Sequence, residues 1–575
     1  MQPSQHTAQA SHWPRLAIIA AVGLLLALPL LLNGCPRGHD ILHHLIFSHH
    51  FTAQFWQGEF YPRWLQNMNG GFGSPAFFFY APLPFWVTAL LSPPLWIEGI
   101  STQPLAISAT LALIASGLTA YLWLQSFSLP RHALLAALIY MALPYHLLVD
   151  LYMRFAFAEF WSFVWMPLIL YYSRHLALGA RSAIGLAFAL ALLILTHLPS
   201  FILFLPVVIG HALFVPTARH RVHSLLIHGL ACALGVGLAA LYWLPAMTTQ
   251  QHVSMPSMYT GFLFYANSFL DSWPNFQNGW SFRRYLSFIS VLTAVLGGCA
   301  WWVSRSAPAW QREHKFWLLV ALGALYMMWP ISKPVWDWLP IVQKVQFPWR
   351  FGGVLALATA ALIALASTGV DAKINAKAAT CGWGVLGLLL LSELLVGIQP
   401  MFMQPVSEEL SRQSLLTSRS PLEYRPRWVP PELFSFQQIG HFASDTAKIQ
   451  SLQSDTRWQL LAWQPRAIAV QVTAPTASQL TLHQFYYPGW QASLAEGTRL
   501  PLGPNANGLL QLAIPAGSYR LNLALTPLPQ ELAGELISAL SLLVALLCGY
   551  RQRRSRAAAR AHSLHSHRPT DPTPD

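Results

Sequence analysis

Apolar runs recur along most of this chain, each long enough to form a helix of about twenty residues that crosses a bilayer. Inside hydrocarbon the backbone must satisfy its own hydrogen bonds, so such runs are expected to be helical. Only 10% of the 575 residues are charged, against about 25% in an average soluble chain. The sequence therefore excludes a fibrous, disordered or cytosolic protein and predicts an α-helical polytopic membrane protein.

Twelve of the runs are predicted membrane spans. They cover residues 16–32, 104–126, 132–149, 160–178, 183–199, 200–216, 224–246, 285–303, 316–332, 351–370, 382–400 and 531–550. Another apolar run, at 76–97, carries four prolines and a row of aromatic residues. Proline interrupts helices, and aromatic side chains favour the membrane interface. We therefore expect 76–97 to form interfacial or re-entrant helices.

The positions of lysine and arginine predict which side each connection faces, because these residues accumulate on the cytoplasmic side. If 76–97 stays outside, the basic clusters from Arg15 to the tail that begins at Arg551 all face the cytoplasm. If 76–97 crosses, all the later clusters face outward. The first arrangement predicts a multi-pass protein with both termini in the cytoplasm. In this arrangement the net charge of +13 is explained by the membrane topology and does not indicate nucleic-acid binding.

The composition changes after residue 400, where charges, turn residues and alternating runs such as 467–473 and 518–524 replace the apolar runs. Strict alternation predicts strands with one buried face. The chain is therefore predicted to contain a transmembrane module at 1–400 with an outer loop at 34–103, a β-sandwich-like outer domain at 401–530, the last span at 531–550, and a basic, disordered cytoplasmic tail at 551–575.

The first outer loop begins with Gly38-His39-Asp40 and continues to His43. An ionisable residue just beyond a span is costly to place there, which makes Asp40 a candidate functional residue. On a helix, His39 and His43 are one turn apart and share a face, and so are Asp40 and His44. That face could hold a divalent ion, or orient Asp40 as a general base. Alternatively, Asp40 is only the N-cap of an interfacial helix with solvated histidines.

Charged residues also crowd the second outer segment, which contains Asp150, Arg154 and Glu159. The planar guanidinium of Arg154 suits a phosphate group. Alternatively, it pairs with Glu159 or Asp150 and only ties helices together. His197 lies at another outer turn, either as a positioning residue or as a structural histidine. Arg350 opens a predicted span on the same side as Asp40, and its alternative role is snorkelling to lipid headgroups.

Several short patterns join these residues. They are Gly38-His39-Asp40 with His43, Tyr61-Pro62-Arg63-Trp64, Gly71 to Pro75, Arg154 with Glu159, His197-Leu198-Pro199, and Gln346 to Arg350. Together they resemble a bacterial family named 6-pyruvoyl-tetrahydropterin synthase-related membrane proteins. That family is similar to the GT-C superfamily of membrane glycosyltransferases, which includes oligosaccharyltransferases and protein mannosyltransferases. The resemblance implies a GT-C-like helical module with interfacial helices and a periplasmic outer domain.

The resemblance also implies an enzyme of the bacterial cell inner membrane that transfers a sugar from a polyprenyl-phosphate-linked donor to an envelope glycan, lipid or protein. Asp40 matches the acidic residue that the superfamily carries in its first outer loop. The superfamily's second acidic motif is not clearly reproduced at 150–159, which leaves the need for a metal open. The candidate site residues are Asp40 and Glu159 for catalysis; Arg154, Arg350 and Arg63 for the donor phosphate; and His39, His43 and His197 for positioning or for a divalent metal ion.

Two other classes of function stay open at this point. A transporter or flippase of lipid-linked glycans would carry charges along its spans and inverted repeats, whereas these charges gather at one outer rim. A non-catalytic membrane assembly protein would place its function in a β domain that binds a glycan or a partner. It would tolerate the loss of Asp40.

Overall fold

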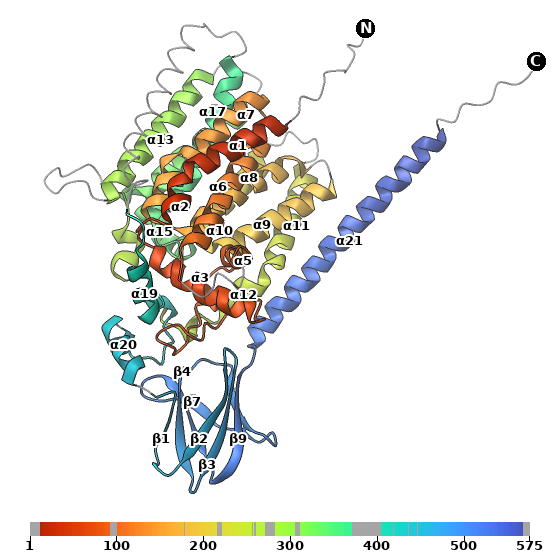
Figure 1. Ribbon diagram of the computed structural model, residues 1–575. Helices are drawn as coiled ribbons and strands as arrows, with labels where there is room; N and C mark the ends of the chain where they lie inside the picture. The colour runs from red at the N-terminus through yellow and green to blue at the C-terminus, as the bar shows by residue number, and fades with distance from the viewer. Residues whose placement is uncertain are drawn as a thin grey trace, which may run out of the picture.

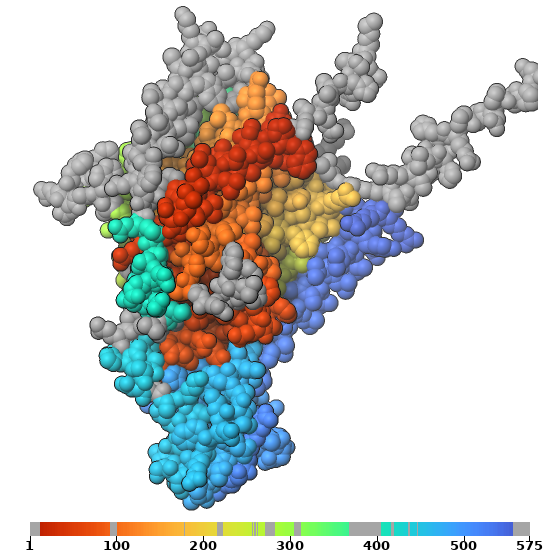
Figure 2. Space-filling model, in the orientation of Figure 1, coloured from red at the N-terminus to blue at the C-terminus, as the bar shows by residue number. Residues whose placement is uncertain are grey.

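The computed structural model describes residues 12–92, 100–176, 179–214, 221–255, 257, 260–270, 282–304, 311–370, 404–417, 419–434, 436–445 and 447–566. These residues form a body of packed helices with a β domain at one end (Figure 1). Figure 2 shows the β domain as a lobe that projects from the helical body.

The helical body contains long helices that run in roughly one direction, with shorter ones at the end next to the β domain (Figure 1). The longer helices are α1 (Trp13–Leu26), α3 (Ile41–Trp56), α6 (Gln103–Leu124), α7 (Pro130–Ala142), α8 (Phe157–Arg174), α9 (Ala180–Thr196), α10 (Leu198–Phe214), α11 (Arg221–Leu238), α13 (Phe282–Ser304), α14 (Gln311–Met328), α17 (Phe351–Val370) and α21 (Pro529–Ser566). The shorter ones are α2 (Leu28–Asn33), α4 (Ala76–Phe79), α5 (Leu83–Leu90), the π-helix η2 (Tyr145–Met153), α12 (Ala240–Thr248), α15 (Lys333–Trp338), α16 (Pro340–Gln343), α19 (Glu408–Thr417), α20 (Phe436–Asp445), and the 3-10 turns η4 (Gln250–His252), η6 (Gly261–Leu263), η7 (Tyr265–Asn267), η10 (Pro330–Ser332), η11 (Pro348–Arg350), η12 (Leu422–Tyr424) and η13 (Pro431–Phe434).

Helices cover every predicted span except 382–400, which lies outside the described residues. Among the described residues, five helices are long and apolar enough to cross a membrane, or up to seven if each of two bent pairs counts as one span. The total of twelve spans therefore stays a prediction. The crossing candidates are Gln103–Leu124, Pro130–Met153, Phe282–Val303, Pro348–Ala366 and Pro529–Ser555, with the bent pairs Val222–Leu238 plus Ala240–Thr248 and Arg312–Met328 plus Pro330–Trp338.

Each of the two bends is accompanied by a specific structural feature. At the 73° bend between α11 and α12, the Leu241 backbone N–H donates to the Ser538 Oγ at 2.8 Å. The Ser538 hydroxyl in turn donates to the Gly237 carbonyl at 3.2 Å. The 92° bend after α14 precedes Pro330, which has no N–H to continue a helix. A side chain of α21 thus satisfies backbone groups that the first break exposes.

The proline-rich run at 76–97 forms two short helices, α4 and α5, as far as the structure describes it, which is to residue 92. Proline lies in the first turn of α5, where its missing N–H costs nothing. With four and eight residues, neither helix reaches the length of about 20 residues that a crossing needs. The expected placement of this run as interfacial or re-entrant helices stays a prediction.

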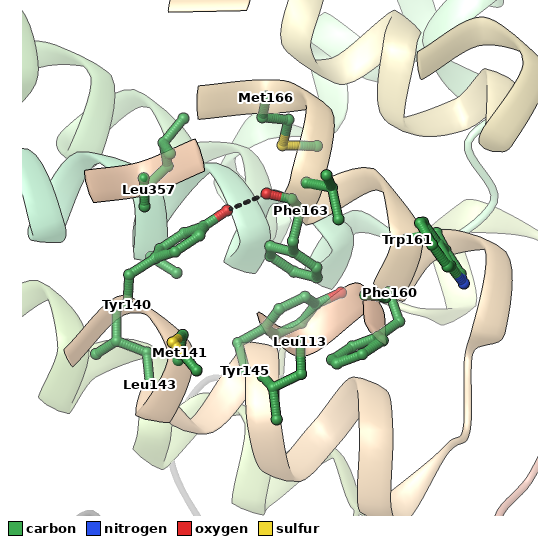
Figure 3. Close-up of a cluster of buried hydrophobic side chains, with 14 of the residues drawn as sticks. Leu113, Tyr140, Met141, Leu143, Tyr145, Phe160, Trp161, Phe163, Met166 and Leu357 are labelled. Carbon is green, nitrogen blue, oxygen red and sulfur yellow. Dashed lines mark hydrogen bonds between the residues drawn. The ribbon is translucent and has the colours of Figure 1, made fainter. Parts of the chain in front are cut away.

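Aromatic and aliphatic side chains of α6, α7, α8 and α17 interlock in the middle of the helical body (Figure 3). Leu113, Tyr140, Phe163 and Leu357 are all buried there. The Tyr140 hydroxyl donates to the Phe163 carbonyl at 3.1 Å, so the polar end of this ring is satisfied. In a bilayer, such close packing holds helices together because lipid tails are as apolar as the core. It therefore fixes where the ends of these helices lie.

The β domain is a sandwich of two antiparallel sheets with the orders β1-β4-β8-β7 and β2-β3-β9-β5-β6. The predicted alternating runs are β3 and β9, which pair with Val470 opposite Leu521. Ile468, Val470 and Val472 point into a common core. The strands are β1 (Ile449–Ser451), β2 (Arg457–Gln464), β3 (Ala467–Ala474), β4 (Ser478–Phe485), β5 (Trp490–Leu494), β6 (Arg499–Leu500), β7 (Leu502–Pro504), β8 (Leu509–Ile514) and β9 (Gly517–Leu525).

The predicted start of the β domain at residue 401 is too early, because the described residues from 404 to 445 form helices and turns. Within α19, Glu408 and Glu409 occupy the first turn, where the helix dipole favours negative charge. Glu408 also pairs with Arg412 one turn later. α19 lies against α3 of the helical body (Figure 2). α19 therefore packs with the helices, whereas Val429, Phe434 and Ile439 further along the segment belong to the same hydrophobic core as the strands.

The predicted disordered tail at 551–575 is also partly wrong, because α21 continues as far as Ser566. The sequence after Arg551 is rich in alanine and arginine, which are strong helix formers. Extending a helix that already exists avoids the cost of starting one. Residues 567–575 lie outside the described part of the chain.

The start of α1 and the end of α21 lie at the end of the helical body opposite to the β domain (Figure 1). This agrees with the charge-based arrangement, in which both termini share one side and the segment 401–530 lies on the other. Arg551, Arg553 and Arg554 are exposed at that opposite end. Which end faces the cytoplasm stays a prediction.

Candidate functional site

A cavity of about 400 Å³ lies between the helical body and the segment that leads to the β domain. Its wall draws on α3, residues 79–81, the start of α10, α12, residues 344–350 and residues 419–424. The charged residues in this wall are Asp40, Arg154, Lys344, Arg350, Arg419 and Glu423. Much of the rest is apolar and includes Phe79, Tyr242, Met247, Leu263 and Phe347.

Asp40 is the residue before α3, but its side chain makes no capping hydrogen bond. Its backbone N–H donates to the Arg154 carbonyl at 2.8 Å, and that of His39 donates to the Met153 carbonyl at 3.3 Å. A Cβ atom on Gly38 would lie 2.8 Å from the same Arg154 carbonyl, so only glycine allows this approach. The carboxylate, 39% exposed, is thus held beside Arg154 at the cavity wall. Asp40 occupies the N-cap position that the alternative interpretation gave it, but its side chain does not cap the helix.

Arg154 lies at the centre of a buried ionic cluster. Its guanidinium bonds to Asp150 at 2.9 Å, Glu159 at 3.0 Å and Asp40 at 3.4 Å. The π-helix η2 ends just before it, and Phe155 adopts a positive φ of 53°, a left-handed backbone that reverses the chain. That reversal brings residues before and after the turn onto one guanidinium.

The ionic cluster engages two residues with predicted roles. The Arg154 side chain lines the cavity, but it is only 5% exposed and its guanidinium bonds to three carboxylates, so it holds Asp40 and has little free surface for the donor phosphate predicted there. Glu159 accepts from Tyr145, Arg154 and Arg350 at 2.8–3.0 Å and does not line the cavity. Both residues tie helices together, as the alternative interpretation of the sequence proposed.

The cavity nevertheless has a cationic side, formed by Lys344, Arg350 and Arg419. Arg350 donates through Nε to Glu159 at 2.9 Å and through Nη1 to the Val345 carbonyl at 2.6 Å. These two bonds fix its guanidinium at the cavity wall. Arginine and lysine side chains in such a place suit a phosphate or diphosphate group.

Arg63, a predicted donor-phosphate ligand, lies elsewhere. Its guanidinium bonds to Glu531 at 2.7 Å, to Glu535 at 2.9 Å and to the Leu241 carbonyl at 2.8 Å. Glu531 follows Arg63 by 468 residues in the chain, so no local pattern could show the pair. Arg63 therefore joins the first outer loop to α21 and is not part of the cavity.

The predicted histidines are divided between two places. His43 and His197 line the cavity, and the His197 Nδ1 lies 2.7 Å from the Ser200 hydroxyl. His39 does not line it, and its ring contacts Phe282 with a centroid distance of 4.8 Å. In the part of the chain that the structure describes, no three histidine, cysteine or acidic side chains converge as a metal site needs. The described residues therefore offer no such ligand set, and the divalent ion that the sequence left open stays a prediction.

His44, which pairs with Asp40 one helical turn earlier but was not among the candidate site residues, also lines the cavity. Its neighbours are aromatic rings from distant segments: Tyr80, Phe85, Phe155 and Phe157. Burial lowers the pKa of His44 from 6.5 to about 4, although the charge of Asp40 acts in the opposite direction. The histidine is thus uncharged in the folded protein at neutral pH.

His44 should make the protein sensitive to acid. As the pH falls from about 6.5 to about 4, the His44 side chain takes up a proton in the unfolded chain but not in the folded chain. This difference lowers the free energy of unfolding by about 3 kcal/mol. We expect the free energy of unfolding, measured with denaturant, to fall by about 3 kcal/mol less in His44→Phe than in the wild type over this pH range. His441→Phe, on the exposed side of α20, is the control. Equal acid sensitivity in all three proteins would contradict the assignment.

Comparison with known proteins gives one strong match and several distant ones. A family model described as "6-pyruvoyl-tetrahydropterin synthase related domain; membrane protein" matches residues 77–403. Among curated proteins, none matches the chain.

Three solved structures match the chain at low sequence identity. Arabinofuranosyltransferase AftD from Mycobacteria is 16% identical, with 68% of this chain and 27% of that chain covered and a TM-score of 0.45. The Archaeoglobus fulgidus oligosaccharyltransferase is 12% identical, with 74% and 58% covered and a TM-score of 0.41. ArnT from Cupriavidus metallidurans, bound to undecaprenyl phosphate, is 12% identical, with 76% and 78% covered and a TM-score of 0.41.

This chain thus spans about a quarter of the length of the arabinofuranosyltransferase and somewhat over half of the oligosaccharyltransferase. Asp40 and the segment 419–424 both fall outside the region that the family model matches. Since that region covers more than half of the 575 residues, the chain belongs to the family of 6-pyruvoyl-tetrahydropterin synthase related membrane proteins.

Proposed function

We propose that this protein is a membrane glycosyltransferase that moves a sugar from a polyprenyl-phosphate-linked donor to an envelope acceptor on the periplasmic side of the bacterial inner membrane. The observation that carries the proposal is the cavity, where one oriented carboxylate, Asp40, shares a wall with Lys344, Arg350 and Arg419. Sugar transfer from a lipid phosphate requires a proton acceptor and cations for the leaving phosphate.

Asp40 would act as the general base. Arg154 holds its carboxylate from one side at 3.4 Å, and the rest of the carboxylate is accessible from the cavity. The acceptor oxygen forms a bond to the anomeric carbon of the donor while the bond from that carbon to the phosphate oxygen breaks. The proton of the acceptor hydroxyl passes to Asp40, and the electron pair of the broken bond leaves with the lipid phosphate.

The cations would stabilise the leaving phosphate as its charge grows. Arg350 is held in place by Glu159 and by the Val345 carbonyl, so it need not reorganise during the reaction. Preorganised charges of this kind are usually a large part of catalysis. The apolar residues of the wall, among them Phe79, Met247 and Phe347, suit the first isoprene units of the lipid.

The proposal is tested by comparing envelope glycans by mass spectrometry between a strain that lacks the protein and the same strain complemented with it. The expected result is a glycan, lipid or protein that lacks one sugar residue in the first strain and regains it in the second. Purified protein should then transfer that sugar from the polyprenyl-phosphate-linked form. Glycans of unchanged mass, with lipid-linked glycan retained on the cytoplasmic leaflet, would refute transfer and indicate a flippase.

A further inference from the structure

A short segment of the chain, Arg419-Ser420-Pro421-Leu422-Glu423-Tyr424, covers one side of the cavity. We call these residues 419–424 the cover segment. All of them except Ser420 line the cavity. The cover segment lies beyond the matched family region at 77–403, so the cavity is completed by a part of the chain that is outside it.

The cover segment is anchored at both ends. The Ser420 backbone N–H and hydroxyl donate to the Asn69 Oδ1 at 2.9 and 3.2 Å. Asn69 is fully buried and has a positive φ of 56°, which asparagine tolerates better than most residues. At the other end, the Tyr424 ring stacks on Phe79 with 9° between the planes. The cover segment therefore has a defined position over the cavity.

Glu423 brings a second carboxylate to the cavity. Within the described residues, its side chain has no ion pair and no hydrogen bond except one from its own backbone N–H. Burial raises the pKa of this carboxyl above its ordinary value. A partly buried carboxylate without a partner is costly, and hydrogen-bond donors on a bound molecule would remove that cost.

Two other polar residues, Tyr80 and Gln346, lie in the same cavity wall as Glu423. The Tyr80 hydroxyl lies where the charges of Asp40, Arg350 and Glu423 all act on it, and no partner for it is found among the described residues. Gln346, also in the wall, holds a positive φ of 67°. A strained backbone conformation lowers the stability of the fold, and such conformations cluster at functional sites, so its position at the cavity is a sign of function.

This combination suits a polyhydroxylated molecule. Hydroxyl groups both donate and accept, so they can satisfy a carboxylate, an amide and a phenol together. The rings of Tyr80, Tyr242 and Tyr424 offer apolar faces in the same wall. Pockets that combine such faces with a few placed polar groups bind small organic molecules with specificity.

We propose that the cover segment forms the acceptor side of the cavity, and that Glu423 accepts hydrogen bonds from the hydroxyl groups of a sugar acceptor. This inference rests on the proposed transferase function and narrows its acceptor from a glycan, lipid or protein to a sugar. The donor phosphate then binds at Lys344 and Arg350, with Arg419 of the cover segment beside the acceptor, and Asp40 acts between the two substrates.

The test measures acceptor and donor separately with the full-length protein. The acceptor probe is the glycan fraction extracted from the strain that lacks the protein, and the donor-side probe is undecaprenyl phosphate. In Glu423→Gln, the acceptor KM should rise about tenfold or more, because a hydrogen bond to a charged group contributes about 1.5–3 kcal/mol. Binding of undecaprenyl phosphate should not change. Tyr80→Phe should raise the acceptor KM as well.

Glu432→Gln is the matched control, since Glu432 is exposed in the following 3-10 turn η13, and its acceptor KM should equal that of the wild type. If the wild type transfers sugar but Glu423→Gln keeps a normal acceptor KM, the acceptor assignment is wrong and the transferase proposal stands. A Glu423→Gln protein that loses undecaprenyl phosphate binding to the same extent would also overturn the assignment. A wild type that transfers no sugar would overturn both.

Discussion

Replacing Arg154 with methionine is expected to lower the free energy of unfolding by about 3–5 kcal/mol, because breaking a buried ion pair leaves an uncompensated charge. Asp150 is fully buried, and its only side-chain hydrogen bond among the described residues comes from Arg154. Glu159 would keep Arg350 and Tyr145 as donors. The cost therefore falls mainly on Asp150. Unfolding by denaturant in detergent micelles, followed by circular dichroism, measures the change.

Arg412→Met is the control for this prediction. Arg412 also pairs with an acid one turn away, Glu408, but both side chains are more than two-thirds exposed. An exposed pair contributes little, so the change should stay below about 1 kcal/mol. Adding Asp150→Asn to Arg154→Met should recover part of the lost stability, since the buried charge is then gone. If Arg154→Met and Arg412→Met had equal effects, the ionic cluster would not stabilise the fold.

Asp40→Asn is expected to reduce kcat for sugar transfer by about 10²- to 10⁴-fold, the usual contribution of a positioned general base. The amide keeps the size of the side chain but cannot take the proton. The Arg154 contact at 3.4 Å involves a half-exposed carboxylate, so the stability should change little. Binding of undecaprenyl phosphate, which depends on Lys344 and Arg350, should stay close to that of the wild type.

The rate is measured with purified protein, the lipid-linked donor and the acceptor fraction described above. Asp455→Asn serves as the control because Asp455 lies exposed in a turn of the β domain, far along the chain from the cavity residues. A transfer rate for Asp40→Asn within a few-fold of the control would refute the role of Asp40 as base. Combined loss of folding and activity would instead assign Asp40 to the ionic cluster alone.

Much of the fold could be predicted because its signals are local. Helices form where apolar runs were found, the proline-rich run forms short helices, and the alternating runs are paired strands. The boundaries failed where local preference was weak or misleading. The helical segment 404–445 carries mixed composition, and the alanine-rich tail extends a helix that is already formed.

The site could be predicted only in part. Asp40 could be predicted because a charged residue just beyond a span is costly to place there, and the structure places it at the cavity. The partners of the arginines could not be predicted, since a guanidinium suits a protein carboxylate as well as a phosphate. No feature of the sequence indicated Glu423 as a site residue. It lies in a segment without periodicity, more than 380 residues beyond Asp40 in the chain.

By itself, the sequence determined that this protein is a membrane protein of many helices with a β domain near its end, because hydrophobic periodicity acts residue by residue. Only the tertiary structure decided how far each charged side chain is paired with others inside the protein and which of them face the cavity. Arg63 and Arg154 each bond to two or more carboxylates, whereas Arg350 bonds to one, Glu159, and lines the cavity together with Lys344. The reason is physical: a charge takes its role from the groups within a few ångströms, and those groups come from distant parts of the chain.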